Sequence, residues 1–319
     1  MMKQFFRSLN HIASEIYAER YILESPYVIS VYLHKLYPTK ADFTSLNGSI
    51  NEGVTIGEFE ALISYFRKRS FVFVDGPDLL DKNLDLTKKH IHVSFDDGYF
   101  NNHMALPILE RHRAKATFYI TTEHNRQGKY FWWDVLCRER AKQAKFTMAE
   151  QKAEVLCFYD LSWEEQYARL MAEFGEDALY GNNEMMRPMT REELVQFSRH
   201  PYVTIGNHTT NHQNLNLLNH LEAKDAIQDG KRYLESEVGK EVSSIAYPYG
   251  FYCDRVIRIA KDVGMQVGQS TETGVDKLIG MDRMAMKRNQ LSGSYNIEDQ
   301  CRQLHVNYSI FQQLKARFT

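Results

Sequence analysis

Apolar and polar positions follow two alternating patterns from Ser25 onward. Short apolar runs typical of buried strands lie at 27–33, 71–74, 90–95, 116–121, 202–205, 244–247, 265–268 and, less strongly, 284–286. Helical spacing of apolar residues separates them, over 56–69, 102–113, 190–198, 221–238 and 254–263. Strands that alternate with helices favour a parallel sheet. The pattern therefore predicts an α/β fold over residues 25–319, a distorted (β/α) barrel with seven or eight parallel strands.

Two segments lie outside this alternation. Residues 123–189 show only helical or irregular patterns, although ordinary β-to-α loops run roughly two to six residues. We therefore predict that they form a helical insertion that caps the barrel. Residues 1–24 are predicted to form an amphipathic helix, because apolar residues recur at helical spacing within 3–23. Packing on the main domain or on a partner subunit is expected for this helix. Contact with a membrane surface is the alternative, which two glutamates in the segment disfavour.

Composition and charge exclude several classes of protein. The chain has 39 Lys and Arg against 41 Asp and Glu, a net charge of −2, which excludes a generally basic protein that coats nucleic acid. Its four cysteines form no CxxC pair, which excludes a zinc ribbon and disfavours a disulfide framework. No apolar run approaches the roughly 20 residues that cross a bilayer, and no signal-peptide core is present. A cytoplasmic protein with no nucleic-acid partner is expected, and its oligomeric state is left open.

Two adjacent carboxylates follow the predicted strand 90–95. Asp96 and Asp97 precede Gly98, which permits a tight turn. Adjacent carboxylates repel each other in a dry site, and a cation bound by one of them would relieve the repulsion. A solvated Asp-Asp-Gly turn explains the same pattern when the motif is taken alone. The Asp-Asp-Gly motif indicates a functional site only if other candidate residues lie near it.

Two further polar motifs follow other predicted strands. His208 and His212 are four residues apart, a spacing that on one helical turn aims both imidazoles at one metal ion. Pro248 and Gly250 flank Tyr249 in a turn, whose backbone N–H is suited to holding a developing oxyanion. A polar helix face and a plain loop are the ordinary explanations of these two motifs. Both motifs nevertheless lie at the carboxyl end of a strand.

His34 also lies at the carboxyl end of a predicted strand, because it directly follows the apolar run 27–33. Barrels of alternating strands and helices build their active sites at the carboxyl ends of the strands, so all four motifs are expected to meet. The expected metal ligands are one carboxylate and two imidazoles: Asp97, His208 and His212. Asp96 would remain as a base, Tyr249 as an oxyanion donor and His34 as an acid. These groups complete a set for metal-assisted hydrolysis of an amide or ester.

The motifs, in this order, resemble those of the polysaccharide deacetylase family, carbohydrate esterase family 4. The first family motif, T-F-D-D-G, reads S-F-D-D-G at 94–98, and the second, H-[ST]-x-x-H, is matched in full at 208–212. The third, R-x-x-P-Y, reads I-A-Y-P-Y at 245–249. A His-bearing fifth motif normally lies near the C-terminus, and V-Y-L-H at 31–34 resembles the arrangement in which it precedes the first. The resemblance covers about residues 27–290.

The resemblance implies a distorted barrel and a divalent metal, zinc first, with cobalt, nickel or iron(II) as alternatives. It also implies the same roles for the residues: Asp96 as base, Tyr249 as oxyanion donor, His34 as acid to the leaving amine. The implied reaction removes an acetyl group from an N-acetylated sugar. Because no export signal is visible, a precursor of a glycan or glycolipid fits as the expected substrate better than a mature cell wall.

The chain departs from the family pattern at the third motif. Ile245 stands where the family has an arginine that tunes the base through a charge pair. Arg283 and Arg288, on the last predicted strand, are the candidates for a replacement charge. A fourth motif with Asp and Trp is not recognisable.

Three other residues are candidates for contact with the substrate. Trp132 and Trp133 of the insertion could stack on a sugar ring, although sealing the insertion onto the barrel is the favoured interpretation. Pro248 is the third, through its turn beside Tyr249.

Two other functions use the same residues. A glycan-binding protein that keeps the metal but has lost turnover stays open because the third-motif arginine is missing. A non-haem iron oxygenase would use the same three ligands. The oxygenase is disfavoured because it gives no role to Asp96 or to the turn at Pro248.

Overall fold

The computed structural model describes residues 26–45, 53–143 and 147–305 of the chain. The helix predicted over 1–24, with its membrane-contact alternative, lies outside these residues. No helix in the described ranges is both long and apolar enough to cross a membrane.

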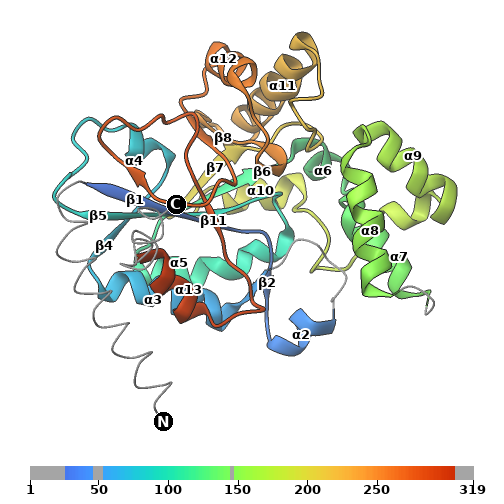
Figure 1. The fold of residues 1–319 in the computed structure, drawn as a ribbon, viewed down its shortest axis with the longest axis horizontal. Helices are drawn as coiled ribbons and strands as arrows, with labels where there is room; N and C mark the ends of the chain where they lie inside the picture. The colour runs from blue at the N-terminus through green and yellow to red at the C-terminus, as the bar shows by residue number, and fades with distance from the viewer. Residues whose placement is uncertain (1–25, 46–52, 144–146, 306–319) are drawn as a thin grey trace, which may run out of the picture.

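Seven parallel strands form a curled sheet, which makes a half-barrel and confirms the predicted fold class (Figure 1). They are β1 (Tyr27–Leu33), β4 (Phe71–Val74), β5 (Lys89–Phe95), β6 (Ala116–Ile120), β7 (Val203–Asn207), β8 (Ser244–Ala246) and β9 (Val267–Gln269). The order across the sheet is β1-β5-β6-β7-β8-β9. β4 pairs with the first half of β5 and β6 with its end. All these strands therefore point their carboxyl ends to one side, where the predicted motifs gather.

The last predicted strand, near 284–286, is wrong in its position. Met286 makes only a single parallel bridge to Gln269, and a two-residue strand, β11 (Asn289–Gln290), follows beside β1. The chain turns just before the bridge, because Asp282 accepts hydrogen bonds from two backbone N–H groups of the following residues. An antiparallel strand, β10 (Asp276–Lys277), pairs with the other end of β1. The segment 286–290 therefore passes from β9 to β1 across the open edge of the half-barrel.

Helices cover the outer face of the sheet. They are α3 (Ile56–Lys68), α5 (Leu106–His112), α10 (Arg191–Phe197), α11 (His220–Val238), α12 (Asp254–Asp262) and α13 (Ile297–His305). Alternate residues of the strands face these helices and form the main core, as the period of two in a strand requires. Shorter elements complete the barrel: α2 (Lys40–Ser45), β2 (Leu36–Tyr37), β3 (Val54–Thr55), α4 (Gly76–Leu80) and the 3-10 turn η2 (Phe100–Ala105).

The inner face of the sheet is polar. On β5, His92 and Ser94 point inward, and the imidazole of His92 bonds Thr117 of β6 at 3.0 Å. Asp96 continues the same alternation one step beyond the strand end. Hydrogen-bonded polar side chains therefore line the barrel interior up to the strand ends where the site lies.

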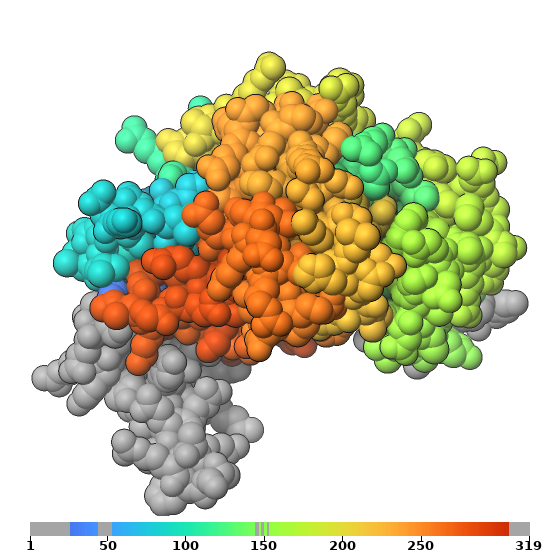
Figure 2. All heavy atoms as spheres, turned by 90° about the horizontal axis from the view of Figure 1, so that it is seen from above, coloured from blue at the N-terminus to red at the C-terminus, as the bar shows by residue number. Residues whose placement is uncertain are grey.

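The insertion between β6 and α10 folds as a group of helices at one side of the barrel (Figure 1). They are α6 (Thr122–Gln127), α7 (Trp132–Ala141), α8 (Met148–Tyr159), α9 (Trp163–Phe174) and the 3-10 turn η3 (Glu176–Leu179). An aromatic cluster of its own fills this unit. Arg140 on α7 forms ion pairs with Glu154 on α8 and Glu173 on α9. We call α7, α8 and α9 the cap. Figure 2 shows the cap, in light green, against the yellow and orange residues of the barrel.

A buried polar network joins the cap to the barrel. Asp134 of α7 forms an ion pair with Lys35, which follows β1, and both side chains are fully buried. The Tyr99 hydroxyl donates to Asp134 at 2.7 Å, and the Trp133 indole N–H donates to the Tyr99 hydroxyl at 2.9 Å. Lys35 and Tyr99 directly follow His34 and the Asp-Asp-Gly turn, so the network fixes the cap to both strand ends that carry candidate catalytic groups.

Asp134→Leu is predicted to destabilise the protein by about 3–5 kcal/mol, because it removes the carboxylate beside a fully buried ammonium group. Urea unfolding followed by tryptophan fluorescence measures the loss. Lys35→Met combined with Asp134→Leu should recover part of it, since neither charge is then buried.

Asp299→Asn is the matched control, because its ion pair with Arg302 is exposed and should be worth at most about 1 kcal/mol. A loss as small for Asp134→Leu as for this control would contradict the role of the buried pair.

Candidate active site

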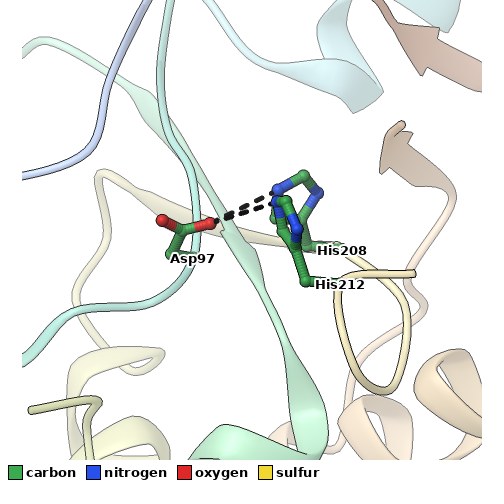
Figure 3. Close-up of side chains that lie close together, drawn as sticks. All are labelled: Asp97, His208 and His212. Atoms are coloured by element: carbon green, nitrogen blue, oxygen red, sulfur yellow. Dashed lines mark ion pairs between the residues drawn. The ribbon is translucent and has the colours of Figure 1, made fainter. Parts of the chain in front are cut away.

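The structure brings the three predicted metal ligands together. The ligand atoms of Asp97, His208 and His212 all lie within 4.8 Å of one another, and all three side chains are buried. Nε2 of His208 lies 3.5 Å and Nε2 of His212 3.7 Å from the same oxygen, Oδ1 of Asp97 (Figure 3). The two imidazoles and the carboxylate therefore converge on one point (Figure 3).

The expectation that the two histidines share a helical turn is wrong. They lie in a turn after β7, in which Thr209 and His212 have positive φ angles of 66° and 54°. Asn207 accepts a hydrogen bond from Thr209 N at 2.9 Å, and Gln213 accepts one from Asn211 N at 3.0 Å. These side-chain acceptors compete with helical hydrogen bonds and hold the backbone in a turn. The turn, rather than a helix, aligns the two rings.

The surroundings fix the orientation of the imidazoles. Nδ1 of His208 lies 2.8 Å from the carbonyl oxygen of Ala246, so it carries the proton and leaves Nε2 as the ligand atom. The His212 ring is held edge-to-face between Trp133, at 4.9 Å, and Tyr249, at 4.4 Å between centroids. A carboxylate and two oriented imidazoles are a donor set that zinc and other first-row divalent metals accept. The residues therefore fit a metal of that kind.

The charges of the cluster also suit a cation. Burial raises the pKa of Asp97, but the neighbouring imidazoles, His208 first, outweigh it and hold the pKa well below its usual range. Burial lowers the pKa of His208, yet Asp97 and Asp96 shift it upward overall. Burial, with the neighbouring His208, lowers the pKa of His212 to about 3. At neutral pH Asp97 is therefore ionised and His212 neutral, the states that metal ligation requires.

Asp96 forms a buried ion pair with Arg288. The guanidinium donates to both carboxylate oxygens, at 2.7 and 2.8 Å, and both side chains are almost completely buried. Ser270 O accepts a further hydrogen bond from Arg288, and the Tyr32 ring lies 4.5 Å from the guanidinium carbon. Burial raises the pKa of Asp96, but the charges of Arg288 and then His208 outweigh burial and lower the pKa below its usual value. The carboxyl therefore stays ionised at neutral pH. Asp96 is thus a charged group beside the metal-ligand cluster.

Of the two arginines considered as replacement charges, Arg288 alone fills that role. Arg283 is not a base-tuning residue, because its guanidinium donates to the backbone oxygen of Leu79 in α4, at 2.9 Å. Ile245, at the position of the family arginine, is fully buried in a hydrophobic cluster. Arg288 lies in the segment 286–290 that crosses from β9 to β1, and from there it enters the barrel interior. The charge therefore comes from a different part of the sequence.

Backbone geometry places the other two motifs at the site. Asp97 and Gly98 have positive φ angles of 76° and 85°, a conformation that L side chains rarely adopt and that is found at functional sites. A side chain at position 98 would also meet Ile120 at 2.9 Å, so only glycine fits this turn. Tyr249 has a φ of 59° within the 3-10 turn η4 (Pro248–Gly250). Both turns therefore hold their chain in strained conformations next to the cluster.

His34 lies beside the two carboxylates. It follows β1, whose last residue accepts a backbone hydrogen bond from Asp96 N at 2.9 Å. Burial lowers the pKa of His34 although Asp97 and Asp96 oppose this shift, so the ring is neutral at neutral pH. Among the described residues its Nδ1 has no hydrogen-bond partner. His34 is thus available for proton exchange with a bound molecule.

A pocket of about 550 Å³ opens onto these groups. Its wall contains His34, Asp96, His208, His212 and Tyr249. Two of its lining residues, Leu156 of the cap and Phe251 of the barrel, are large apolar side chains that are 65% and 47% exposed. The pocket wall therefore combines charged and polar groups of the candidate site with exposed apolar side chains.

The residues expected to contact substrate are only partly at this pocket. Trp133 lines it, but Trp132 does not: its indole is buried, stacks on Phe158 and donates to the Tyr249 hydroxyl at 3.2 Å. Trp132 therefore seals the cap onto the barrel, the favoured interpretation of the sequence. Pro248 is also buried and lies outside the pocket wall, whereas its neighbours Tyr249 and Gly250 form part of it.

Several pocket residues carried no recognised signal in the sequence. Tyr32 could have been found, because it lies two residues before His34 and the strand period places both on one face. Phe251 lies two residues after the third motif. Tyr159 and Asp160 come from the end of α8 in the cap, far from any motif, and only the packing of the cap reveals them.

The fold and the site together form a curled half-barrel that carries a carboxylate and two histidines at the carboxyl ends of its strands. Residues 83–268 match the sequence model of a family described as "Polysaccharide deacetylase". This match covers more than half of the chain, which therefore belongs to the polysaccharide deacetylase family. Members of this family are generally metal-dependent.

Individual relatives agree with this assignment. The Bacillus subtilis protein YxkH, whose name places it among polysaccharide deacetylases, is 28% identical over 221 residues, 68% of this chain and 58% of that protein. The aligned part thus spans less than two thirds of the relative. The deacetylase PplD of Streptococcus pyogenes, solved with acetate, has a TM-score of 0.60 at 17% identity, covering 88% of this chain and 99% of that one. IcaB from Ammonifex degensii has a TM-score of 0.59 at 15% identity, covering 88% and 97%. These two structures share the fold.

The chain is predicted to bind one zinc ion at the Asp97 cluster. His212→Ala should weaken zinc binding by at least about a hundredfold, because it removes one of three converging ligands. Calorimetry on the chelator-treated protein measures this affinity.

His34→Gln is the control, because His34 lies in the same pocket but outside the ligand cluster. The site assignment would be refuted if the two variants bound zinc equally well.

Proposed function

We propose that this protein is a metal-dependent deacetylase that hydrolyses the N-acetyl group of an amino sugar. One observation carries the proposal: the Asp96 carboxylate is paired with Arg288 and adjoins, without belonging to, the cluster of Asp97 and two imidazoles. Asp96 is thus a charged carboxylate that is not itself a metal ligand but lies beside the candidate metal site. Membership of the polysaccharide deacetylase family supports the substrate class.

Asp97, His208 and His212 would hold the metal, with zinc proposed first because two imidazoles and one carboxylate form a common zinc set. When bound, such an ion polarises a carbonyl group and lowers the pKa of water toward neutrality. The remaining steps fall to other residues of this chain.

Asp96 is proposed to take the proton from the attacking water. Its carboxylate is ionised through Arg288, and the bidentate pair fixes its orientation. The backbone N–H of Tyr249 is proposed to donate to the oxygen on which negative charge develops at the acetyl carbonyl. The positive φ of Tyr249 supports this role, since a turn locked in that conformation presents its backbone without further rearrangement.

His34 is proposed to deliver a proton to the leaving amine. Its imidazole is neutral at rest, so the proton must reach it during turnover. Asp96, which lines the same pocket, is proposed to pass on the proton that it has taken from water. Acetate and the free amine are the products. The expected substrate is an N-acetylated glycan or a glycolipid precursor.

The alternative of a metal-containing glycan-binding protein without turnover rested on the missing third-motif arginine. The missing arginine no longer supports this alternative, because Arg288 forms a bidentate ion pair with the same proposed base, Asp96. The oxygenase alternative leaves the Asp96–Arg288 pair and the Tyr249 turn without a role. Neither alternative is favoured by an observation of its own.

Asp96→Asn is predicted to lower acetate release from N-acetylated oligosaccharides by at least about a hundredfold, because the amide cannot accept the proton of water. Zinc binding should persist, since Asp96 is not a ligand. His208→Ala should abolish both. Acetate can be measured by a coupled enzymatic assay, with and without a chelator.

Asp262→Asn, an exposed carboxylate on α12, is the control and should retain full activity. Turnover by Asp96→Asn at the rate of this control would defeat the proposed role of Asp96.

Arg288→Met is predicted to move the acid limb of the pH profile of kcat/KM to higher pH by about one unit or more. Arg288 lowers the pKa of Asp96 and burial raises it, so without the guanidinium the base is lost at a higher pH as the pH falls. The profile of acetate release against pH checks this direction.

Arg283→Gln should leave the limb in place, because the Arg283 guanidinium donates to the backbone oxygen of Leu79 in α4 and forms no ion pair with Asp96. An unchanged limb in both variants would show that Arg288 does not tune the base.

A further inference from the structure

The two imidazoles of the candidate metal site are held in different ways. Nδ1 of His208 is hydrogen-bonded to the backbone oxygen of Ala246, whereas Nδ1 of His212 has no hydrogen-bond partner among the described residues. A metal-binding imidazole is usually oriented by a hydrogen bond at its second nitrogen. The orientation of the His212 ring therefore depends on the aromatic rings that pack against it, Trp133 and Tyr249.

A buried hydrogen bond fixes the indole of Trp133. Its N–H donates to the Tyr99 hydroxyl at 2.9 Å, and both side chains are at most 2% exposed. The same hydroxyl donates its own proton to Asp134 at 2.7 Å. The indole also stacks on Phe131, with 4.8 Å between the ring centroids. Because a buried N–H without an acceptor is unfavourable, the indole is held in its place against His212.

Tyr99 connects this contact to the turn that carries another candidate ligand. It directly follows Asp97 and Gly98, whose positive φ angles define that turn. The contacts form a closed circle. They run along the chain from Asp97 to Tyr99, then through Trp133 to His212, whose Nε2 lies 3.7 Å from Oδ1 of Asp97. One turn therefore supplies a carboxylate ligand and the anchor of the ring that packs on an imidazole ligand.

We infer that Tyr99 is a positioning residue for the metal site. Its hydroxyl holds the Trp133 indole against His212, and the indole keeps Nε2 of His212 directed at the metal. Tyr99 is not itself a member of the ligand cluster. This inference rests on the proposed function, because it concerns the metal that this function requires. The cap thereby helps to assemble the metal site, in addition to forming part of the pocket wall.

Tyr99→Phe removes the hydroxyl but keeps the aromatic ring that lies beside Lys35. We expect zinc to bind this variant about three- to tenfold more weakly than wild type, because all three ligands remain but the His212 ring is less constrained. Calorimetry on the chelator-treated protein measures the affinity.

Tyr233→Phe is the matched control, because it also removes a hydroxyl hydrogen bond from a buried tyrosine, in this case to Asn125 at 2.8 Å. Its zinc affinity should equal that of wild type, even if urea unfolds both variants equally early. The same zinc affinity in Tyr99→Phe and Tyr233→Phe would overturn the inference.

Trp133→Phe tests the path from Tyr99 to the ligand, because it removes the indole N–H. This variant should also bind zinc more weakly than wild type. If the hydroxyl acts through this N–H, adding Tyr99→Phe should weaken zinc binding no further. An additional loss in the double variant would refute the path. If Tyr99→Phe fails to fold, Trp133→Phe alone decides, since wild-type zinc affinity in that variant would also refute the inference.

Cobalt in place of zinc gives a readout that does not depend on turnover. The visible absorption of Co²⁺ varies with the geometry of its ligands, so the bands should shift in Tyr99→Phe and stay unchanged in Tyr233→Phe. Identical bands in both variants and in wild type would contradict the positioning role.

These measurements also separate the inference from the proposed function. If wild type binds zinc but releases no acetate, the deacetylase proposal fails, and the zinc affinities of the variants still decide the role of Tyr99. If wild type releases acetate and Tyr99→Phe binds zinc as tightly as wild type, only the inference fails. A wild-type protein that binds neither zinc nor cobalt would refute both.

Discussion

The buried negative charge of two adjacent carboxylates is the constraint around which this molecule is built. Asp96 and Asp97 are both nearly inaccessible to solvent, and burial alone raises the pKa of each. The protein balances them separately: Arg288 faces Asp96 and the imidazoles of His208 and His212 face Asp97. Each acid thereby stays ionised in a different environment. The separation suits the two neighbouring residues to the different roles proposed for them, Asp96 as base and Asp97 as metal ligand.

The position of Arg288 links the catalytic charge to the closure of the barrel. The segment 286–290 bridges β9 at Met286 and pairs with β1 at β11, and Arg288 lies between these two contacts. Its guanidinium therefore enters the interior from the open edge of the sheet, whereas the family arginine would come from position 245. Because Coulomb attraction depends on where the charge lies and not on its place in the sequence, the same pairing can be built from another segment.

The cap contributes both to the fixation of this centre and to the wall of its pocket. Asp134 ties α7 to Lys35 and Tyr99, next to the strand ends that carry His34 and the Asp-Asp-Gly turn. The same helix presents Trp133 to the edge of the His212 ring. Another cap helix, α8, supplies Leu156 and Tyr159 to the pocket wall. A displaced cap would therefore alter ligand orientation and substrate selection together.

Most strands and helices of the barrel, and the four motifs at the strand ends, could be predicted from the sequence alone, because apolar periodicity and chain direction are local properties. The position of the last strand could not, since it depends on how the chain returns to β1. The sequence also limited the replacement charge to two arginines. Only the tertiary structure chose Arg288 over Arg283, since that choice depends on how the chain crosses the open edge of the sheet. The turn that holds His208 and His212 was likewise decided by side-chain acceptors that a spacing of four cannot reveal. The pocket wall likewise combines Tyr159 and Asp160 of the cap with residues of the barrel, and this juxtaposition exists only once the cap has packed.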